Sequence, residues 1–162
     1  MAKQTKPKIS ERQKKRNFKE LLIFSAVALA LIIVDLVSKW VVQNSCLPGV
    51  LNAVIPNFFY ITLSYNTGAA FSMGASWGVT GRILGILISL VMSFLIPFYW
   101  VRHNDEFSSF QRAIAALMTA GAIGNLIDRA FYWEGIVGFN GVIDFFQFYL
   151  GGGPSANTSV LN

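Results

Sequence analysis

The chain has 162 residues, of which 54% are hydrophobic, 14% are aromatic and only 13% are charged. Soluble domains carry about a quarter charged residues, so this composition indicates a membrane protein. The net charge of +5 does not indicate a nucleic-acid partner, because most Lys and Arg residues lie in a short N-terminal tail. With one cysteine, Cys46, and one histidine, His103, a disulfide framework and a Cys/His metal site are excluded, and no metal or other cofactor is expected.

The chain begins with a basic tail over residues 1–20, which the positive-inside rule places in the cytoplasm. An apolar helix over 21–43 follows, long enough to cross a bilayer core of about 30 Å. It ends without an Ala-x-Ala site, so we expect a retained helix and not a cleaved signal peptide. Asp35 and Lys39 lie four residues apart on one face of this helix, where they are expected to pair.

The next segment, over 47–76, contains "IPNFFYITLSYNTGAAFSM", in which aromatic and β-branched residues alternate along the chain. Period-two alternation of such residues predicts short strands. Aromatic side chains suit the boundary between membrane and water, so we expect a small β-cradle on the outer surface of the membrane.

Two further segments can span the membrane, and residues 21–162 are predicted to form a single membrane domain. The predicted segments are a helix over 82–101, a cytoplasmic loop over 102–112 with two arginines and the histidine, a helix over 113–131, and an extracytoplasmic loop over 132–162. The predicted fold class is therefore an all-α polytopic membrane protein with a small extracytoplasmic β-cradle.

Polar residues inside a span are costly to insert, so each is a candidate for a functional role. Asn125, Asp128 and Arg129 fall on one face of the third helix, and Gly121 and Gly124 allow a close approach of another helix there. We expect Arg129 to hold Asp128 ionised, which suits a structural support better than proton transfer.

Asp144 stands in "GVIDFF", among apolar residues and with no basic residue after Arg129. Apolar surroundings favour the neutral form of a carboxyl group, as a group that must both accept and donate a proton requires. The alternative is a loop aspartate that caps a turn. A carboxylate that activates water usually works with a second one, but Asp128 and Asp35 are both expected to be ion-paired. A Ser-Lys dyad using Lys39 stays open, while the topology separates Cys46 from His103.

Four motifs occur in order along the chain: "DLVSK" at 35–39, "NTGAAFSM" at 66–73, "GAIGNLIDR" at 121–129 and "VIDFF" at 142–146. Together they resemble the lipoprotein signal peptidase (signal peptidase II) family. The resemblance implies a four-helix aspartic peptidase of the bacterial inner membrane, of which three helices are present here. It also implies removal of the signal peptide from a diacylglyceryl-modified prolipoprotein, before the lipidated cysteine, with that substrate and membrane lipid as partners and a monomer as the working form.

Carried over by motif, the resemblance implies that Asp144 is the first catalytic aspartate. The supporting and substrate-binding residues that it implies are Asp35, Lys39, Asn66, Gly68, Gly121, Asn125, Asp128, Arg129 and Asn162. The partner aspartate is expected beyond Asn162, so we expect the 162-residue chain to be inactive and a chain longer by about thirty residues, one more span with its flanks, to be active. The stretch over 130–141 is longer than the resemblance predicts.

Two alternatives remain at this level. A non-catalytic three-span membrane protein or a degenerate homologue would explain the length of the chain without a missing segment. A complete peptidase could instead pair Asp128 with Asp144, which predicts that their carboxyl groups lie within hydrogen-bond reach of each other.

Overall fold

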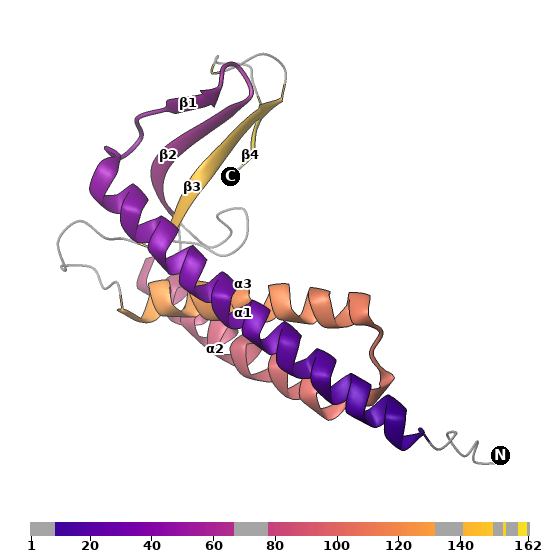
Figure 1. Cartoon of the computed structure of the whole chain (residues 1–162). Helices are drawn as coiled ribbons and strands as arrows, with labels where there is room; N and C mark the ends of the chain where they lie inside the picture. Colours follow the sequence, from indigo (N-terminus) through magenta and orange to yellow (C-terminus); the bar gives the residue numbers. More distant parts are fainter. Residues whose placement is uncertain (1–8, 67–77, 132–140, 151–153, 155–158, 162) are drawn as a thin grey trace.

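A computed structural model of the protein describes residues 9–66, 78–131, 141–150, 154 and 159–161. The helices are α1 (Glu11–Ser45), α2 (Gly78–Arg102), the short 3-10 helix η3 (Asn104–Glu106) and α3 (Ser109–Phe131). The strands are β1 (Asn52–Ile55), β2 (Phe59–Asn66), β3 (Val142–Leu150) and β4 (Ser159–Leu161), which form one antiparallel sheet in the order β1-β2-β3-β4. The sheet stands at the end of the helices where α1 finishes, and the start of α1 lies at the opposite end (Figure 1).

The three long helices are each long and apolar enough to cross a membrane. Their outward surfaces carry large exposed apolar side chains such as those of Trp40, Phe94 and Leu117. Lipid tails are as apolar as these side chains, so this exposure suits a bilayer and would be unfavourable in water. The predicted fold class, a mostly helical membrane protein with a small sheet, is confirmed.

The helices begin earlier than the sequence predicted. Helix α1 starts at Glu11 and not at 21, because the Ser10 side chain caps it by accepting a 3.2 Å hydrogen bond from the main-chain N–H of Gln13. The Glu, Lys, Arg and Gln residues that follow are good helix formers. Part of the expected tail is therefore helical, and α3 likewise starts at Ser109, four residues before the expected 113.

Strand β3 was not predicted, because residues 132–162 were expected to form a loop. Its sequence, "VIDFFQFYL", is rich in β-branched and aromatic residues, a signal that favours a strand. Strand β3 pairs with β2 along its length, and Ile143 packs in a buried cluster with Leu63 of β2 and Val42 of α1. This cluster fixes the sheet against the end of α1.

At the opposite end of the bundle, a polar network joins the start of α1 to η3 and α3. The guanidinium of Arg112, only 2% exposed, donates through Nε to Oδ1 of Asn104 (2.9 Å), through Nη2 to the carbonyl oxygen of Asn104 (2.6 Å) and through Nη1 to Oε2 of Glu20 (2.7 Å). Asn17 of α1 donates to Oδ1 of Asp105 (2.9 Å). Buried polar groups that are paired in this way hold the helices together at low cost.

Replacing Arg112 with alanine is expected to lower the free energy of unfolding by about 3 kcal/mol, because the buried acceptors of Asn104 would lose their donors. Arg102→Ala is the matched control, since Arg102 is exposed at the end of α2. Both variants should be unfolded in detergent solution and followed by circular dichroism. Equal stability of the two variants would contradict a structural role for the network.

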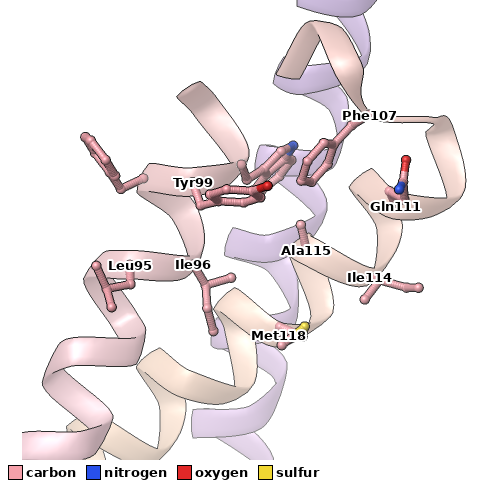
Figure 2. Close-up of a pocket in the computed structure, with 10 residues that line it drawn as sticks. Leu95, Ile96, Tyr99, Phe107, Gln111, Ile114, Ala115 and Met118 are labelled. Atoms are coloured by element: carbon pink, nitrogen blue, oxygen red, sulfur yellow. The ribbon is translucent and has the colours of Figure 1, made fainter. Parts of the chain in front are cut away.

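A groove of about 610 Å³ lies between α2 and α3 near this end of the bundle. Figure 2 shows Tyr99 and Phe107 at one side of the groove and Met118 across from them, and the Tyr99 and Phe107 rings lie 6.0 Å apart between centroids. Among its described lining residues are no carboxylate, histidine, lysine or arginine side chains. The groove is therefore a surface for apolar groups and is not a candidate for acid-base chemistry.

Candidate active site

Lys39 joins two carboxylates that come from different helices. Its Nζ lies 2.7 Å from Oδ2 of Asp35, one turn back on α1, and 2.7 Å from Oδ2 of Asp128 on α3. The Lys39 and Asp128 side chains are 7% and 1% exposed, whereas that of Asp35 is 35% exposed. The predicted pair of Asp35 and Lys39 is present, and it extends into an ion triad that ties α1 to α3.

The expected pairing of Asp128 with Arg129 is wrong. Neighbouring residues on a helix do not face each other, so the two side chains leave α3 in different directions. Asp128 points to Lys39 of α1, whereas Nη1 of Arg129 donates a 2.9 Å hydrogen bond to Oγ of Ser89 on α2. The two residues therefore join α3 to two different helices.

Gly124, and not Gly121, provides the close approach between α1 and α3. A Cβ atom at Gly124 would collide with the carboxylate of Asp35, whereas a Cβ atom at Gly121 would meet nothing within 4 Å. Gly121 and Asn125 instead line a groove of about 320 Å³ between α2 and α3, together with Arg129. The space left at Gly124 is what lets the triad form.

Gly124→Ala is expected to lower the free energy of unfolding by about 2 kcal/mol, since the added methyl group must displace Asp35 or push the helices apart. Gly121→Ala is the control on the same helix, and its effect should stay within about 1 kcal/mol, because only helix propensity changes there. Thermal unfolding in detergent measures both variants. If Gly121→Ala lowered the free energy of unfolding as much as Gly124→Ala, the contact between the added methyl group and Asp35 would not explain the lost stability.

Asp144 lies within strand β3, so the alternative of a loop aspartate that caps a turn is wrong. It is half-buried and stands opposite Ser64 of β2. Asn66 is two residues further along β2 and so faces the same side of the sheet. Its Nδ2 donates a 3.0 Å hydrogen bond to Oδ2 of Asp144. The pairing of β2 with β3 thus brings together two of the predicted site residues from distant parts of the chain.

The sheet residues and the membrane residues meet at one end of the bundle. The negative charges of Asp128 and Asp144 both lie near enough to Arg129 to attract its guanidinium. The main-chain N–H of Ile143 in β3 lies near the carboxyl group of Asp128. Among the described residues no hydrogen bond joins Asp128 to Asp144, whose side chains contact Lys39 and Asn66 respectively. The structure therefore does not support a dyad of these two aspartates.

Other kinds of site find no support among the residues that the structure describes. Lys39 contacts two carboxylates there and no serine hydroxyl, which argues against a Ser-Lys dyad. No group of three or more His, Cys, Asp or Glu side chains in the described ranges could hold a metal ion. Two predicted site residues, Gly68 and Asn162, lie outside the described residues, as does Glu134.

Helix α2 contributes two residues that the sequence reasoning missed. Besides the hydrogen bond that Ser89 accepts from Arg129, a Cβ atom at Gly85 would lie 3.1 Å from Nε and 3.3 Å from Cδ of Arg129. Small residues recur every fourth position here, at 81, 85, 89 and 93. That spacing places them on one face of the helix and is typical of close helix packing in membranes, so it was the available signal.

Sequence comparisons identify similar proteins. The family described as "Signal peptidase (SPase) II" matches residues 27–160. The lipoprotein signal peptidase of Neisseria meningitidis serogroup C (strain 053442) is 38% identical over 125 residues, covering 76% of this chain and 70% of that protein. Those of Actinobacillus succinogenes and Bacillus pumilus are 36% and 33% identical, covering 84% and 80% of this chain and 76% of each relative.

One solved structure shares the fold. It is described as a bacterial membrane enzyme structure obtained by the in meso method at 2.3 Å resolution, and it matches with a TM-score of 0.63. The match covers 86% of this chain and 76% of the other, at 24% sequence identity. The arrangement of membrane helices and sheet is therefore one that a bacterial membrane enzyme also adopts.

Proposed function

Because the chain belongs to the signal peptidase II family, we propose that it works as an aspartic endopeptidase in which Asp144 is one of two catalytic carboxylates. Proteins of this family are proteases that remove signal peptides from prolipoproteins, and this chain is a multi-pass protein of the bacterial inner membrane. The finer proposal is that it cleaves diacylglyceryl-modified prolipoproteins immediately before the lipidated cysteine.

The observation that carries the proposal is the setting of Asp144. Its half-buried carboxyl group lies on the sheet at the end of the bundle and is oriented by the amide of Asn66, 3.0 Å away. A carboxyl group held in one orientation at the edge of the membrane can take a proton from water and return it to the leaving amine. General acid-base hydrolysis of this kind needs a second carboxylate to share the proton.

The second carboxylate is proposed to lie beyond Asn162, as the resemblance implies. The chain contains eight Asp and Glu residues. Asp35 and Asp128 contact Lys39. Glu11, Glu20, Asp105 and Glu106 lie at the other end of the bundle, in the first half of α1 and in η3. Glu134 is the other acidic residue of the outer segments, so Glu134→Gln must be tested as the rival source of the second carboxylate.

The membrane residues near Asp144 are proposed to support the site and to contact the substrate. The triad of Asp35, Lys39 and Asp128 fixes α1 against α3 below the sheet, and the contact of both carboxylates with Lys39 lowers the cost of keeping these charges in an apolar setting. Arg129 offers a cationic group with several N–H donors within the electrostatic reach of Asp144, which suits binding of a substrate oxygen.

The proposed orientation places the sheet and Asp144 on the outer face of the membrane. The basic first turns of α1 and the Arg112 network lie together at the opposite end of the bundle (Figure 1). By the positive-inside rule that end faces the cytoplasm. Substrate acyl chains would then remain in the outer leaflet while the peptide reaches Asp144 from the water side.

The proposal is tested by incubating the purified protein in detergent micelles with a diacylglyceryl-modified prolipoprotein and detecting the mature lipoprotein by mass spectrometry. The matched control substrate has its lipidated cysteine replaced by serine and therefore carries no lipid. The 162-residue chain and a chain that includes any coding sequence after Asn162 should be compared. We expect cleavage of the lipidated substrate alone, and only by the longer chain.

Other outcomes would assign the activity differently. Cleavage by the 162-residue chain that is lost in the Glu134→Gln variant would move the second carboxylate to Glu134. Binding of the lipidated substrate without cleavage by either chain would favour the non-catalytic homologue. Cleavage of both substrates at equal rates would contradict recognition of the lipid.

A further inference from the structure

Helix α2 contains none of the four motif segments, yet two of its small residues contact Arg129 of α3. Gly85 is buried, and a Cβ atom there would lie 3.1 Å from Nε and 3.3 Å from Cδ of Arg129. Ser89, one turn further on and 7% exposed, accepts a 2.9 Å hydrogen bond from Nη1. The arginine side chain is therefore in contact with α2 both along its stem and at its guanidinium.

The two contacts restrict Arg129 in complementary ways. The absence of a side chain at Gly85 lets the stem lie directly on the α2 backbone, and the Ser89 hydroxyl then sets the direction of the planar guanidinium. A long side chain held at two points loses little further freedom when it binds a substrate. The negative charge of Asp144 attracts the guanidinium of Arg129 that is held in this way.

We propose that Gly85 and Ser89 are positioning residues for the reaction, which act by holding the guanidinium of Arg129 in the orientation that the substrate requires. The inference rests on the proposed peptidase function, because it assigns Arg129 to the same site. It extends that site to α2, which no motif of the chain indicates. Neither residue needs to touch the substrate.

In the longest form of the chain that is active, Ser89→Ala is expected to lower kcat/KM for the lipidated prolipoprotein about tenfold, since a hydrogen bond to a charged group is lost. Ser93→Ala is the matched control, because Ser93 lies one turn further along α2 and its buried Oγ has no hydrogen-bond partner among the described residues. The control should keep kcat/KM within about twofold of the parent. Gly85→Ala should act in the same direction as Ser89→Ala.

A double-variant comparison separates positioning from general packing. In an Arg129→Lys background, Ser89→Ala should change kcat/KM less than about twofold, because the group that Ser89 orients is already altered. A tenfold loss in that background, or full activity of Ser89→Ala alone, would overturn the proposal. Melting temperatures of all variants show whether any loss reflects unfolding.

A spectroscopic readout keeps this inference separate from the peptidase proposal. With ¹⁵N-labelled arginine, the Nε–H signal of Arg129 is identified by its absence in Arg129→Lys. Ser89→Ala should shift this signal and speed its exchange with water, whereas Ser93→Ala should leave it unchanged. If neither the 162-residue chain nor the longer chain cleaved the substrate but the signal behaved in this way, the contact would stand and the peptidase function would fail. An unchanged signal in Ser89→Ala would overturn the proposal even in an active enzyme.

Discussion

The Asp144→Asn variant is expected to lose prolipoprotein cleavage by about 10³-fold or more in kcat, because an amide can neither accept a proton from water nor return it to the leaving amine. The substitution preserves the shape of the side chain, and its amide oxygen can still accept the hydrogen bond from Asn66. We therefore expect the melting temperature and the affinity for the lipidated substrate to stay close to those of the parent. Cleavage should be measured with the longest form of the chain that is active.

Asp105→Asn is the matched control for this substitution. Asp105 is an exposed aspartate at the opposite end of the bundle, where it accepts a 2.9 Å hydrogen bond from Asn17 that an amide oxygen can also accept. This variant should cleave at the parent rate. Residual cleavage by Asp144→Asn within tenfold of the parent would rule out Asp144 as a catalytic carboxylate.

Lys39→Met is expected to have the largest effect on stability, lowering the free energy of unfolding by about 3 kcal/mol or more, because Asp128 would become an uncompensated buried charge. The Asp128 side chain is 1% exposed, and neither carboxylate oxygen accepts a well-aligned hydrogen bond from another described residue. Methionine keeps most of the length and apolar surface of the lysine stem. Unfolding in mixed detergent micelles, followed by circular dichroism, measures the loss.

The second variant of this pair removes the buried charge as well. Lys39→Met combined with Asp128→Asn should regain stability to within about 1.5 kcal/mol of the parent, since the fully buried ion is removed and water can reach the remaining carboxylate of Asp35, which is 35% exposed. Asp35→Asn alone should cost less than Lys39→Met, because Asp35 is partly exposed and water can solvate its surroundings. If the double variant were as unstable as Lys39→Met, the charge of Asp128 would not be what Lys39 compensates.

The parts of the fold that depend on local pattern could be predicted from the sequence. Apolar runs of sufficient length gave the three helices, and the spacing of four residues gave the pair of Asp35 and Lys39. Alternation of aromatic and β-branched residues gave the strand that became β2. In each case the feature lies within one helix or strand, so the spacing of residues along that element is enough to predict it.

The parts that depend on two elements meeting could not be predicted in the same way. Asp128 was assigned to its neighbour Arg129, but its partner is Lys39 of another helix, and no periodicity states which helix faces which. Gly121 and Gly124 are equivalent in the sequence pattern, and only the packing of α1 shows that the side chain of Asp35 lies against Gly124. The contact of Asn66 with Asp144 likewise required the register of β2 on β3.

Two ion pairs between α1 and α3 also fix the register of these helices. Glu20 contacts Arg112 near one end, and Lys39 contacts Asp128 near the other. At a rise of 1.5 Å per residue, Glu20 and Lys39 are roughly 28 Å apart along α1, close to the thickness of a bilayer core. Apolar helix surfaces in lipid have little preference for one alignment over another, so sliding by a single turn would break both contacts together. The height of the sheet, and with it that of Asp144, is therefore set by two ion pairs, one near each side of the bilayer core.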